Sequence, residues 1–318
     1  MARSILLFAL LTGAASADTI GFVYANGSFT NITGVPGLAA ANGINDAGQI
    51  VGDAGGAGFI LSGGVYTRLA LPGPVLSMHT AGINNAGQVV GFYTDFITGP
   101  LVNHGFLYAN GTFTTIDDPL AGSGGIGCGF CGSTFPYGIN DAGEVIGYYV
   151  AAGQRFHGFL YNAGTFTTFD DPSALGGDTV AFDINNAGQF AGAYTIAGSG
   201  TTHGFVYNGS QFIDIDYPGA AQPFGTAVSG INDAGAVVGV YGDTHSTSHG
   251  FLYVNGTFTA IDYPRAANGT NVSGINNAGQ IVGTAFGVPP APEVSTGWLA
   301  LPVLIGIVAR RLTLRRIQ

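Results

Sequence analysis

A histidine recurs directly before a Gly-Phe pair in this chain, and imidazole is a side chain that binds metal ions and transfers protons. Equivalent positions in neighbouring copies of a repeat lie too far apart to share one ion. We therefore expect each imidazole to hydrogen-bond the backbone of the loop before it rather than to act as a ligand. The four residues are His104, His157, His203 and His249.

Aspartates also recur, where the last strand of each copy is expected to end. Carboxylate oxygens on one rim are possible Ca²⁺ ligands, but no stretch has the dense alternating acids of a calcium-binding loop. Aspartate before proline or before Tyr-Pro is typical of a turn, and we favour that role. We expect no cofactor, with structural Ca²⁺ as the alternative. The candidate residues are Asp117, Asp118, Asp170, Asp171, Asp214, Asp216 and Asp262.

Cys128 and Cys131 form an unrepeated Cys-x-x-Cys in a long insertion rich in glycine. A thioredoxin-type redox site with this spacing begins a helix, and nothing around it has a helical pattern. Two cysteines alone cannot complete a zinc site. In an oxidising, exported setting we expect a disulfide that closes this loop.

The composition favours strands as the elements that hold these residues. Of 318 residues, 55 are glycine, 22 phenylalanine and 14 tyrosine, which disfavours long helices and suits β-structure. Residues 18–292 hold 17 acidic and 3 basic side chains, a formal charge of −14. Such a body would repel nucleic acid, so we expect no nucleic-acid partner.

Two phrases occur six times and define an internal repeat. One is built on Gly-Phe followed by apolar residues. The other is Ile-Asn-(Asn/Asp)-Ala-Gly, which predicts a hairpin with a type I turn and glycine in the left-handed position. Its copies lie 39 to 56 residues apart, a period typical of propellers and solenoids. The hairpin-turn asparagines are Asn45, Asn84, Asn140, Asn185, Asn232 and Asn276.

Each copy reads as four strands, and the two ends of the body hold half a copy each. Residues 20–24 and 28–32 match the third and fourth strands, while residues 272–276 and 280–283 match the first and second. Together they complete one unit. The sequence therefore predicts an all-β fold over residues 18–286, a six-bladed β-propeller of four-stranded antiparallel blades with two-plus-two closure. An open β-solenoid is the rival, but no capping unit is evident.

The two ends of the chain have the patterns of targeting segments. Residues 1–17 have a basic start, an apolar run and a small-residue cleavage site between Ala17 and Asp18, which predicts a helical signal peptide. A buried N-terminal strand or helix is the alternative. Residues 287–294 form a proline-rich linker, and residues 295–318 predict a hydrophobic anchor helix with an arginine-rich tail.

These phrases resemble known families. The His-Gly-Phe repeats resemble the HAF repeat of extracellular bacterial proteins, which implies an exported, propeller-like protein of no established activity. The C-terminal layout resembles the PEP-CTERM sorting signal of Gram-negative bacteria, which a membrane exosortase processes. A plain membrane anchor is the alternative, because valine stands where that motif has its second proline. The motif residues are Pro292, Glu293 and Val294.

Together these features predict an exported protein of the cell envelope, cell surface or extracellular matrix, anchored to the membrane through its C-terminal helix. We expect a non-catalytic scaffold that binds a glycan or a protein, because the repeated acids and histidines form no unique catalytic pair. An exported propeller glycoside hydrolase or lyase that acts on polysaccharide is the alternative. An exosortase-type enzyme is the expected processing partner.

Deletion of residues 287–318 tests the predicted membrane attachment. Without the apolar segment the protein should move from the membrane fraction to the soluble periplasmic or secreted fraction, because the segment expected to hold it in the bilayer is gone. Cell fractionation with immunoblotting measures this. An unchanged distribution between the fractions would contradict the anchor.

Overall fold

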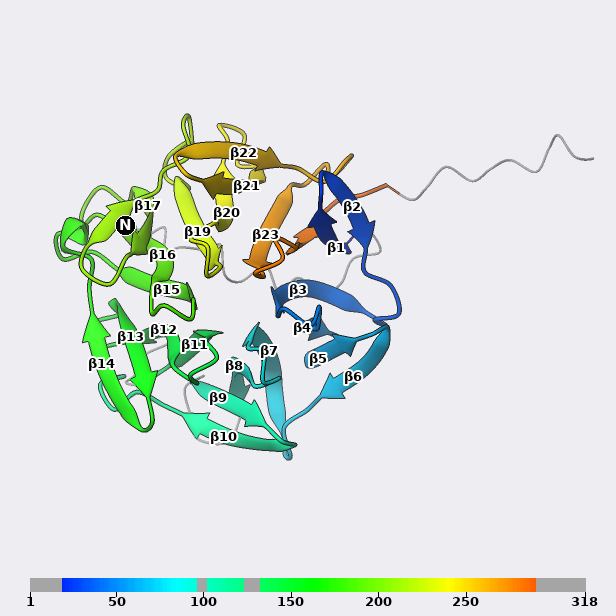
Figure 1. Cartoon of the computed structure of the whole chain (residues 1–318). Coiled ribbons are helices and arrows are strands. Elements are labelled where there is room, and N and C mark those ends of the chain that lie inside the picture. The colour runs from blue at the N-terminus through cyan, green and yellow to red at the C-terminus, as the bar shows by residue number, and fades with distance from the viewer. Residues whose placement is uncertain (1–18, 96–101, 123–131, 290–318) are drawn as a thin grey trace, which may run out of the picture. The chain divides into compact units, whose positions relative to one another are not determined.

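The computed structural model describes residues 19–95, 102–122 and 132–289, and these residues form six antiparallel four-stranded sheets arranged as blades around one axis (Figure 1). The predicted six-bladed propeller is thus confirmed. In five of the blades the strands follow one another outward from the axis in chain order, and the sixth combines strands from both ends of the body. The longer connections run from the outermost strand of one blade to the innermost strand of the next.

The blades are numbered 1 to 6 in the order of their innermost strands. Blade 1 is β3 (Leu38–Ile44), β4 (Ile50–Ala54), β5 (Ala57–Ser62) and β6 (Val65–Leu69). Blade 2 is β7 (Val75–Ile83), β8 (Val89–Asp95), β9 (Asn103–Ala109) and β10 (Thr112–Ile116). Blade 3 is β11 (Thr134–Ile139), β12 (Val145–Val150), β13 (Phe156–Asn162) and β14 (Thr165–Phe169).

The remaining blades repeat this plan. Blade 4 is β15 (Thr179–Ile184), β16 (Phe190–Thr195), β17 (Thr202–Tyr207) and β18 (Phe212–Asp214). Blade 5 is β19 (Thr226–Ile231), β20 (Val237–Gly242), β21 (Ser248–Val254) and β22 (Thr257–Ile261). Blade 6 is β23 (Thr270–Ile275), β24 (Ile281–Ala285), β1 (Ile20–Ala25) and β2 (Ser28–Asn31).

Blade 6 closes the ring with strands from both ends of the body. Strand β1 pairs antiparallel with β24, so that Phe22 lies opposite Gly283 and Tyr24 opposite Ile281. The predicted two-plus-two closure is confirmed. The two ends of the body are thereby held in one sheet, and the ring leaves only the short outer edges of its blades.

The recurring phenylalanine of the Gly-Phe phrase forms the core of each blade. It lies on the third strand and is fully buried in all six blades, where loss of the ring would cost about 3–5 kcal/mol. The ring packs over a glycine of the second strand, such as Gly283 beneath Phe22, where a Cβ atom would strike both the ring and the inner strand. The six residues are Phe22, Phe59, Phe106, Phe159, Phe205 and Phe251.

The predicted hairpin turn forms after each inner strand. In blade 1 the N–H of Gly48, whose φ is +72°, donates to the carbonyl of Asn45 at 3.0 Å. The Asn45 side-chain oxygen accepts the N–H of Gln49 at 3.0 Å and so closes its own turn. The equivalent asparagines make the same bond in the other five blades.

The other end of the same amide joins neighbouring blades. Each turn asparagine donates through Nδ2 to the backbone carbonyl of the equivalent asparagine in the next blade, at 3.0–3.3 Å. The sixth bond runs from Asn276 back to Asn45, so the circle is closed. We call this the asparagine ring. All six side chains are buried, and the bonds satisfy amides that would otherwise be costly to bury.

A second circle lies beside the first, at the next residue of each turn. Aspartate and asparagine alternate there around the axis, and each backbone N–H donates to the side-chain oxygen of the next member at 2.8 Å. Each asparagine amide also bonds the carboxylates on both sides at 2.8–3.0 Å. The members of this Asp/Asn ring are Asp46, Asn85, Asp141, Asn186, Asp233 and Asn277.

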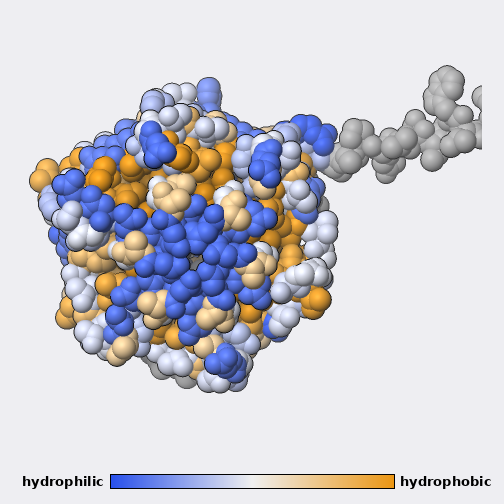
Figure 2. All heavy atoms as spheres, in the orientation of Figure 1, coloured by the Kyte–Doolittle hydropathy of each residue, from blue (hydrophilic) through white to orange (hydrophobic). Residues whose placement is uncertain are grey.

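Both rings lie on the face of the propeller that carries the turns after the inner strands. Together they make the centre of that face strongly hydrophilic, as the space-filling view shows (Figure 2). Burial alone would raise the pKa of Asp46, but hydrogen bonds from Asn277 and Asn85 outweigh it and lower that pKa below its usual value. The Asp46 carboxylate is therefore held in its charged form by the amides of its neighbours.

Several predicted features lie outside the described residues. In the part of the chain that the structure describes, the one helix is a single 3₁₀ turn, η2 (Pro172–Ala174), and no helix is long and apolar enough to cross a membrane. The signal peptide, the disulfide, most of the linker and the C-terminal helix stay predictions. The residues concerned are Ala17, Asp18, Cys128, Cys131, Pro292, Glu293 and Val294.

The substitution Asn277→Asp tests the Asp/Asn ring. It would place three carboxylates side by side and remove two amide donors, so we expect the free energy of unfolding at pH 7 to fall by about 2–3 kcal/mol. The loss should shrink at a pH low enough to protonate the acids. Chemical denaturation measures both effects. Asn255→Asp, at an exposed hairpin tip, is the matched control, and equal losses in the two variants would contradict the role of the ring.

Candidate functional site

A pocket of about 140 Å³ lies on the propeller axis, lined by the parts of the inner strands that precede the asparagine ring. A cavity of roughly 150 Å³ holds a benzene-sized molecule, so this space suits one ring of a ligand. We call it the axial pocket. The inner strands line it from two positions, which lie one residue and three residues before the Gly-Ile or Asp-Ile pair that ends the strand; β11 and β15 contribute only the nearer one. Unlike the turns and the blade cores, these positions differ from blade to blade.

One wall of the axial pocket is polar and comes from blades 6, 1 and 2. Nδ1 of His79 lies 2.6 Å from Oδ2 of Asp53, and both side chains are largely buried. Asp53 also accepts the Thr80 N–H at 2.9 Å and the Asn42 amide at 3.1 Å. The Asp53 carboxylate, itself held by Thr80 and Asn42, thus lies within ion-pairing distance of the imidazole.

Asn271 and Thr284 extend the polar wall from blade 6. The side-chain oxygen of Asn271 is buried and has no hydrogen-bond partner among the residues that the structure describes. A buried acceptor without a partner costs about 1–3 kcal/mol, which a bound donor group would recover. This oxygen marks one position in the pocket that suits a donor group of a ligand.

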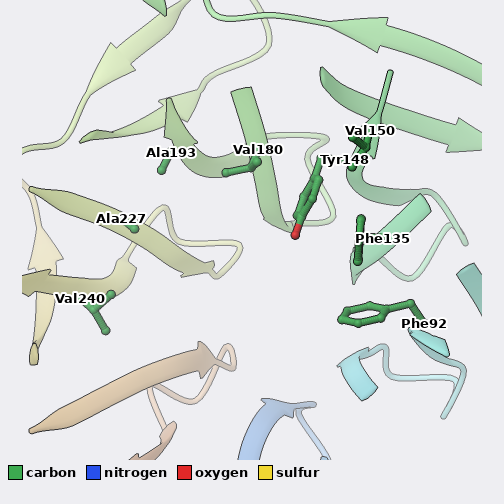
Figure 3. Packing of buried hydrophobic residues seen from close by; sticks show 8 residues of the cluster. All are labelled: Phe92, Phe135, Tyr148, Val150, Val180, Ala193, Ala227 and Val240. Carbon is green, nitrogen blue, oxygen red and sulfur yellow. The ribbon is translucent and has the colours of Figure 1, made fainter. Parts of the chain in front are cut away.

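The opposite wall is apolar and comes from blades 2 to 5. Behind this wall, eight buried side chains from the first and second strands of these blades form the cluster shown in Figure 3, and Ala227 and Val240 of that cluster line the pocket. Tyr137 and Phe182 pack against this cluster and line the axial pocket, with their rings 5.1 Å apart in a T-shaped contact. The cluster consists of Phe92, Phe135, Tyr148, Val150, Val180, Ala193, Ala227 and Val240.

The Tyr137 hydroxyl is the polar group of this aromatic wall. Burial, together with nearby Tyr148 and Asp53, raises the pKa of Tyr137 well above its usual value. The phenol therefore stays neutral over the physiological range and keeps its proton as a hydrogen-bond donor. The rings of Tyr137 and Tyr148 stack at 5.7 Å, which holds the aromatic wall in one orientation.

The recurring histidines lie on the outer rim and have a different partner from the predicted one. Nδ1 of each faces the carboxylate found 13 residues later rather than loop backbone, at 2.7–3.0 Å. Each imidazole also packs on a tyrosine of the second strand, with ring centroids 5.1–5.4 Å apart. The rim triplets are Tyr93, His104 and Asp117; Tyr149, His157 and Asp170; Tyr194, His203 and Asp216; and Tyr241, His249 and Asp262.

The three members of a rim triplet are present together or absent together. Blade 1 has Ala54 opposite Ala57 and no acid 13 residues later, and blade 6 has Ala285 opposite Ile20 and also no acid. The hydrogen bond to Asp117 raises the pKa of His104. Each triplet ties the second, third and fourth strands of its blade together, which accounts for the recurring histidines as structural parts.

The other repeated aspartates make turns, as predicted. The side-chain oxygens of Asp118 and Asp171 accept the backbone N–H of Leu120 and Ser173, each at 2.8 Å. Asp214 instead accepts the Tyr194 hydroxyl at 3.2 Å. Among the described residues, no three or more acidic, histidine or cysteine side chains are grouped so as to hold a metal ion. Calcium binding stays an untested alternative.

Asp183 is a departure from the repeat that sequence reasoning missed. It stands where the other five inner strands have glycine before Ile-Asn, and it lines the cavity beside the asparagine ring. Its carboxylate accepts the N–H of Ile184 and, in the next blade, that of Ile231, each at 2.9 Å. Close enclosure by the inner strands removes water from the carboxyl and raises its pKa to about 7, against a usual 3.8.

Comparison with known proteins supports the fold. No protein-family model and no curated protein sequence matches this chain. The structure of a putative TolB from Agrobacterium tumefaciens is 12% identical and covers 85% of this chain and 99% of its own, with a TM-score of 0.59. TolB from Acinetobacter baumannii is 12% identical, with coverages of 88% and 67% and a TM-score of 0.50. At these identities the likeness shows the propeller fold alone.

A looser match is the lectin of Aleuria aurantia, solved with a fucose-containing disaccharide. It is 13% identical, with coverages of 75% and 85% and a TM-score of 0.49. This similarity is too distant to carry an argument about what the present chain binds. The axial pocket is therefore interpreted from its own residues.

The substitution Asp183→Gly tests the pKa of the axial carboxyl. Because the folded state keeps this proton up to about pH 7 and the unfolded chain releases it near pH 3.8, wild-type stability should fall relative to the variant as pH rises through that window. Above pH 7 the difference should be constant. Denaturation curves at several pH values measure it, and parallel curves for the two proteins would rule out the raised pKa.

Proposed function

We propose that this chain is an exported, surface-attached or matrix-associated binding protein whose axial pocket takes one sugar residue of an envelope or matrix polysaccharide. A sugar ring has an apolar face formed by its C–H groups and an edge of hydroxyl groups. The observation that carries the proposal is the division of the axial pocket into an aromatic wall and a polar wall. The two walls match the two sides of such a ring.

The pattern of the repeat supports a single site on the axis. The six copies hold the same residue types at the turns and in the blade cores, which serve the fold. They hold unlike residues at the positions that face the axis, such as Asn42, His79, Tyr137, Phe182 and Ser229. Unlike residues around one shared cavity are what an asymmetric ligand requires.

The proposed export and surface attachment rest on the sequence. The signal peptide, the HAF-type repeats and the PEP-CTERM-like segment together support export, with processing by an exosortase-type enzyme or retention by a membrane helix. A protein displayed there would meet polysaccharide, which is the reason for choosing a glycan over other ring-shaped ligands.

Glycan-array binding of the full chain tests the proposed site. The wild type should bind a defined set of glycans, and Asn271→Ala should weaken binding about tenfold, because the variant removes an acceptor at the ligand position. Asn255→Ala, at the exposed hairpin tip, is the control for surface effects. Thermal unfolding checks that each variant is folded. Absence of glycan binding by the folded wild type would overturn the proposal.

The alternative, a polysaccharide hydrolase or lyase, is favoured by one observation. A histidine held by a carboxylate, as His79 is held by Asp53, is an arrangement that general bases use. The neutral Tyr137 phenol on the facing wall is a proton donor of the kind such chemistry needs. Release of new reducing ends or unsaturated products from polysaccharide, lost in His79→Ala, would establish this function in place of simple binding.

A further inference from the structure

On the polar wall the side-chain oxygens of Asn42, Ser229 and Asn271 are available as acceptors, and the Tyr137 hydroxyl on the facing wall is available as a donor. Asn42 donates its amide hydrogens to Asp53 and to the Thr80 carbonyl, at 3.1 and 2.8 Å, which leaves its side-chain oxygen available as an acceptor. The Ser229 hydroxyl donates to the Val272 carbonyl at 2.7 Å and so retains only its lone pairs. The Asn271 oxygen is buried without a partner among the described residues.

The charges around the axial pocket also disfavour an anionic ligand. None of the described residues that line it is lysine or arginine, whereas Asp53 contributes a buried carboxylate. Nδ1 of His79 lies 2.6 Å from that carboxylate, so the imidazole already has an anionic neighbour. An anionic ligand would therefore lose its water without gaining a positive partner, which is costly in a partly enclosed site.

These observations extend the proposed sugar-binding function, on which this inference rests. We propose that the axial pocket selects an amino sugar, a six-membered ring with a protonated amine, and rejects sugars that carry a carboxylate. The ammonium group has three hydrogens to donate and no need of an acceptor role, which matches the oxygens of Asn271 and Asn42. The apolar face of the ring lies against Tyr137 and Phe182, whose π-systems also attract a nearby cation.

The net negative charge of the propeller also favours a cationic sugar over an anionic one. Residues 18–292 carry a formal charge of −14, so a cationic sugar is drawn toward the protein while an anionic one is repelled. That field alone does not place the amine. The position is given by the unpartnered Asn271 oxygen, which lies in the pocket and not on the charged surface.

Calorimetric titration of the full chain with four matched methyl glycosides tests the selection. The probes are those of glucosamine, glucose, N-acetylglucosamine and glucuronic acid, together with the same set in the galacto configuration. Within each of the two sets of four, every other probe differs from the neutral sugar in a single substituent. We expect an amino sugar to bind about tenfold more tightly than its neutral counterpart, the worth of one charge-assisted hydrogen bond, and the uronic acids not to bind.

Equal binding of amino and neutral sugars, or preference for an acetylated or acidic sugar, would overturn the amine selection and leave the proposed function standing. Failure of the folded protein to bind any of these glycosides or any arrayed glycan would overturn both. Asn271→Asp should increase the ratio of amino-sugar to neutral-sugar affinity by a further fewfold. Asn255→Asp adds the same charge at an exposed hairpin tip and should leave that ratio unchanged, so equal changes in both variants would show a general field effect and count against the site.

Discussion

Each blade is joined to the next by one repeated hydrogen bond, from the side-chain amide of a turn asparagine to the backbone carbonyl of its counterpart. The same side chain also closes its own hairpin, so a single residue type serves both the local turn and the assembly of blades. Because the sixth bond returns to the first blade, the inner strands are held at one radius. The asparagine ring fixes this radius at one end of the inner strands. The same radius sets the width of the axial pocket further along these strands, where the residues that face the axis differ from blade to blade.

The turn and the closure were predictable because their signals are local. Asn-Asp-Ala-Gly specifies a hairpin from adjacent residues alone, and the half copies at the two ends complement each other along the chain. The asparagine ring was not predictable in the same way. The bond from Asn84 to Asn140 crosses 56 residues, and its existence depends on how closely six sheets approach one axis. The rim triplets were hidden for a similar reason, since strand register alone brings Tyr194 beside His203.

The axial pocket was not predicted from the sequence because its residues do not repeat. Attention to recurring histidines and acids favoured positions that repeat, and those positions serve the fold. His79, Tyr137 and Asn271 stand at equivalent or nearby positions of inner strands where the other blades have different residues. The signal was present as a lack of repetition, at the residues just before Gly-Ile-Asn. Asp183 carried the same kind of signal, a charged side chain at a position that is otherwise glycine.

The alternation of aspartate and asparagine around the axis also limits how this molecule can have grown. Each carboxylate lies between two amides, and each amide between two carboxylates. Gain or loss of a single copy would set two acids or two amides against each other, whereas gain or loss of two adjacent copies keeps every neighbour complementary. A closed circle of this kind therefore requires an even number of blades, and the six blades supply three Asp/Asn pairs around one axis.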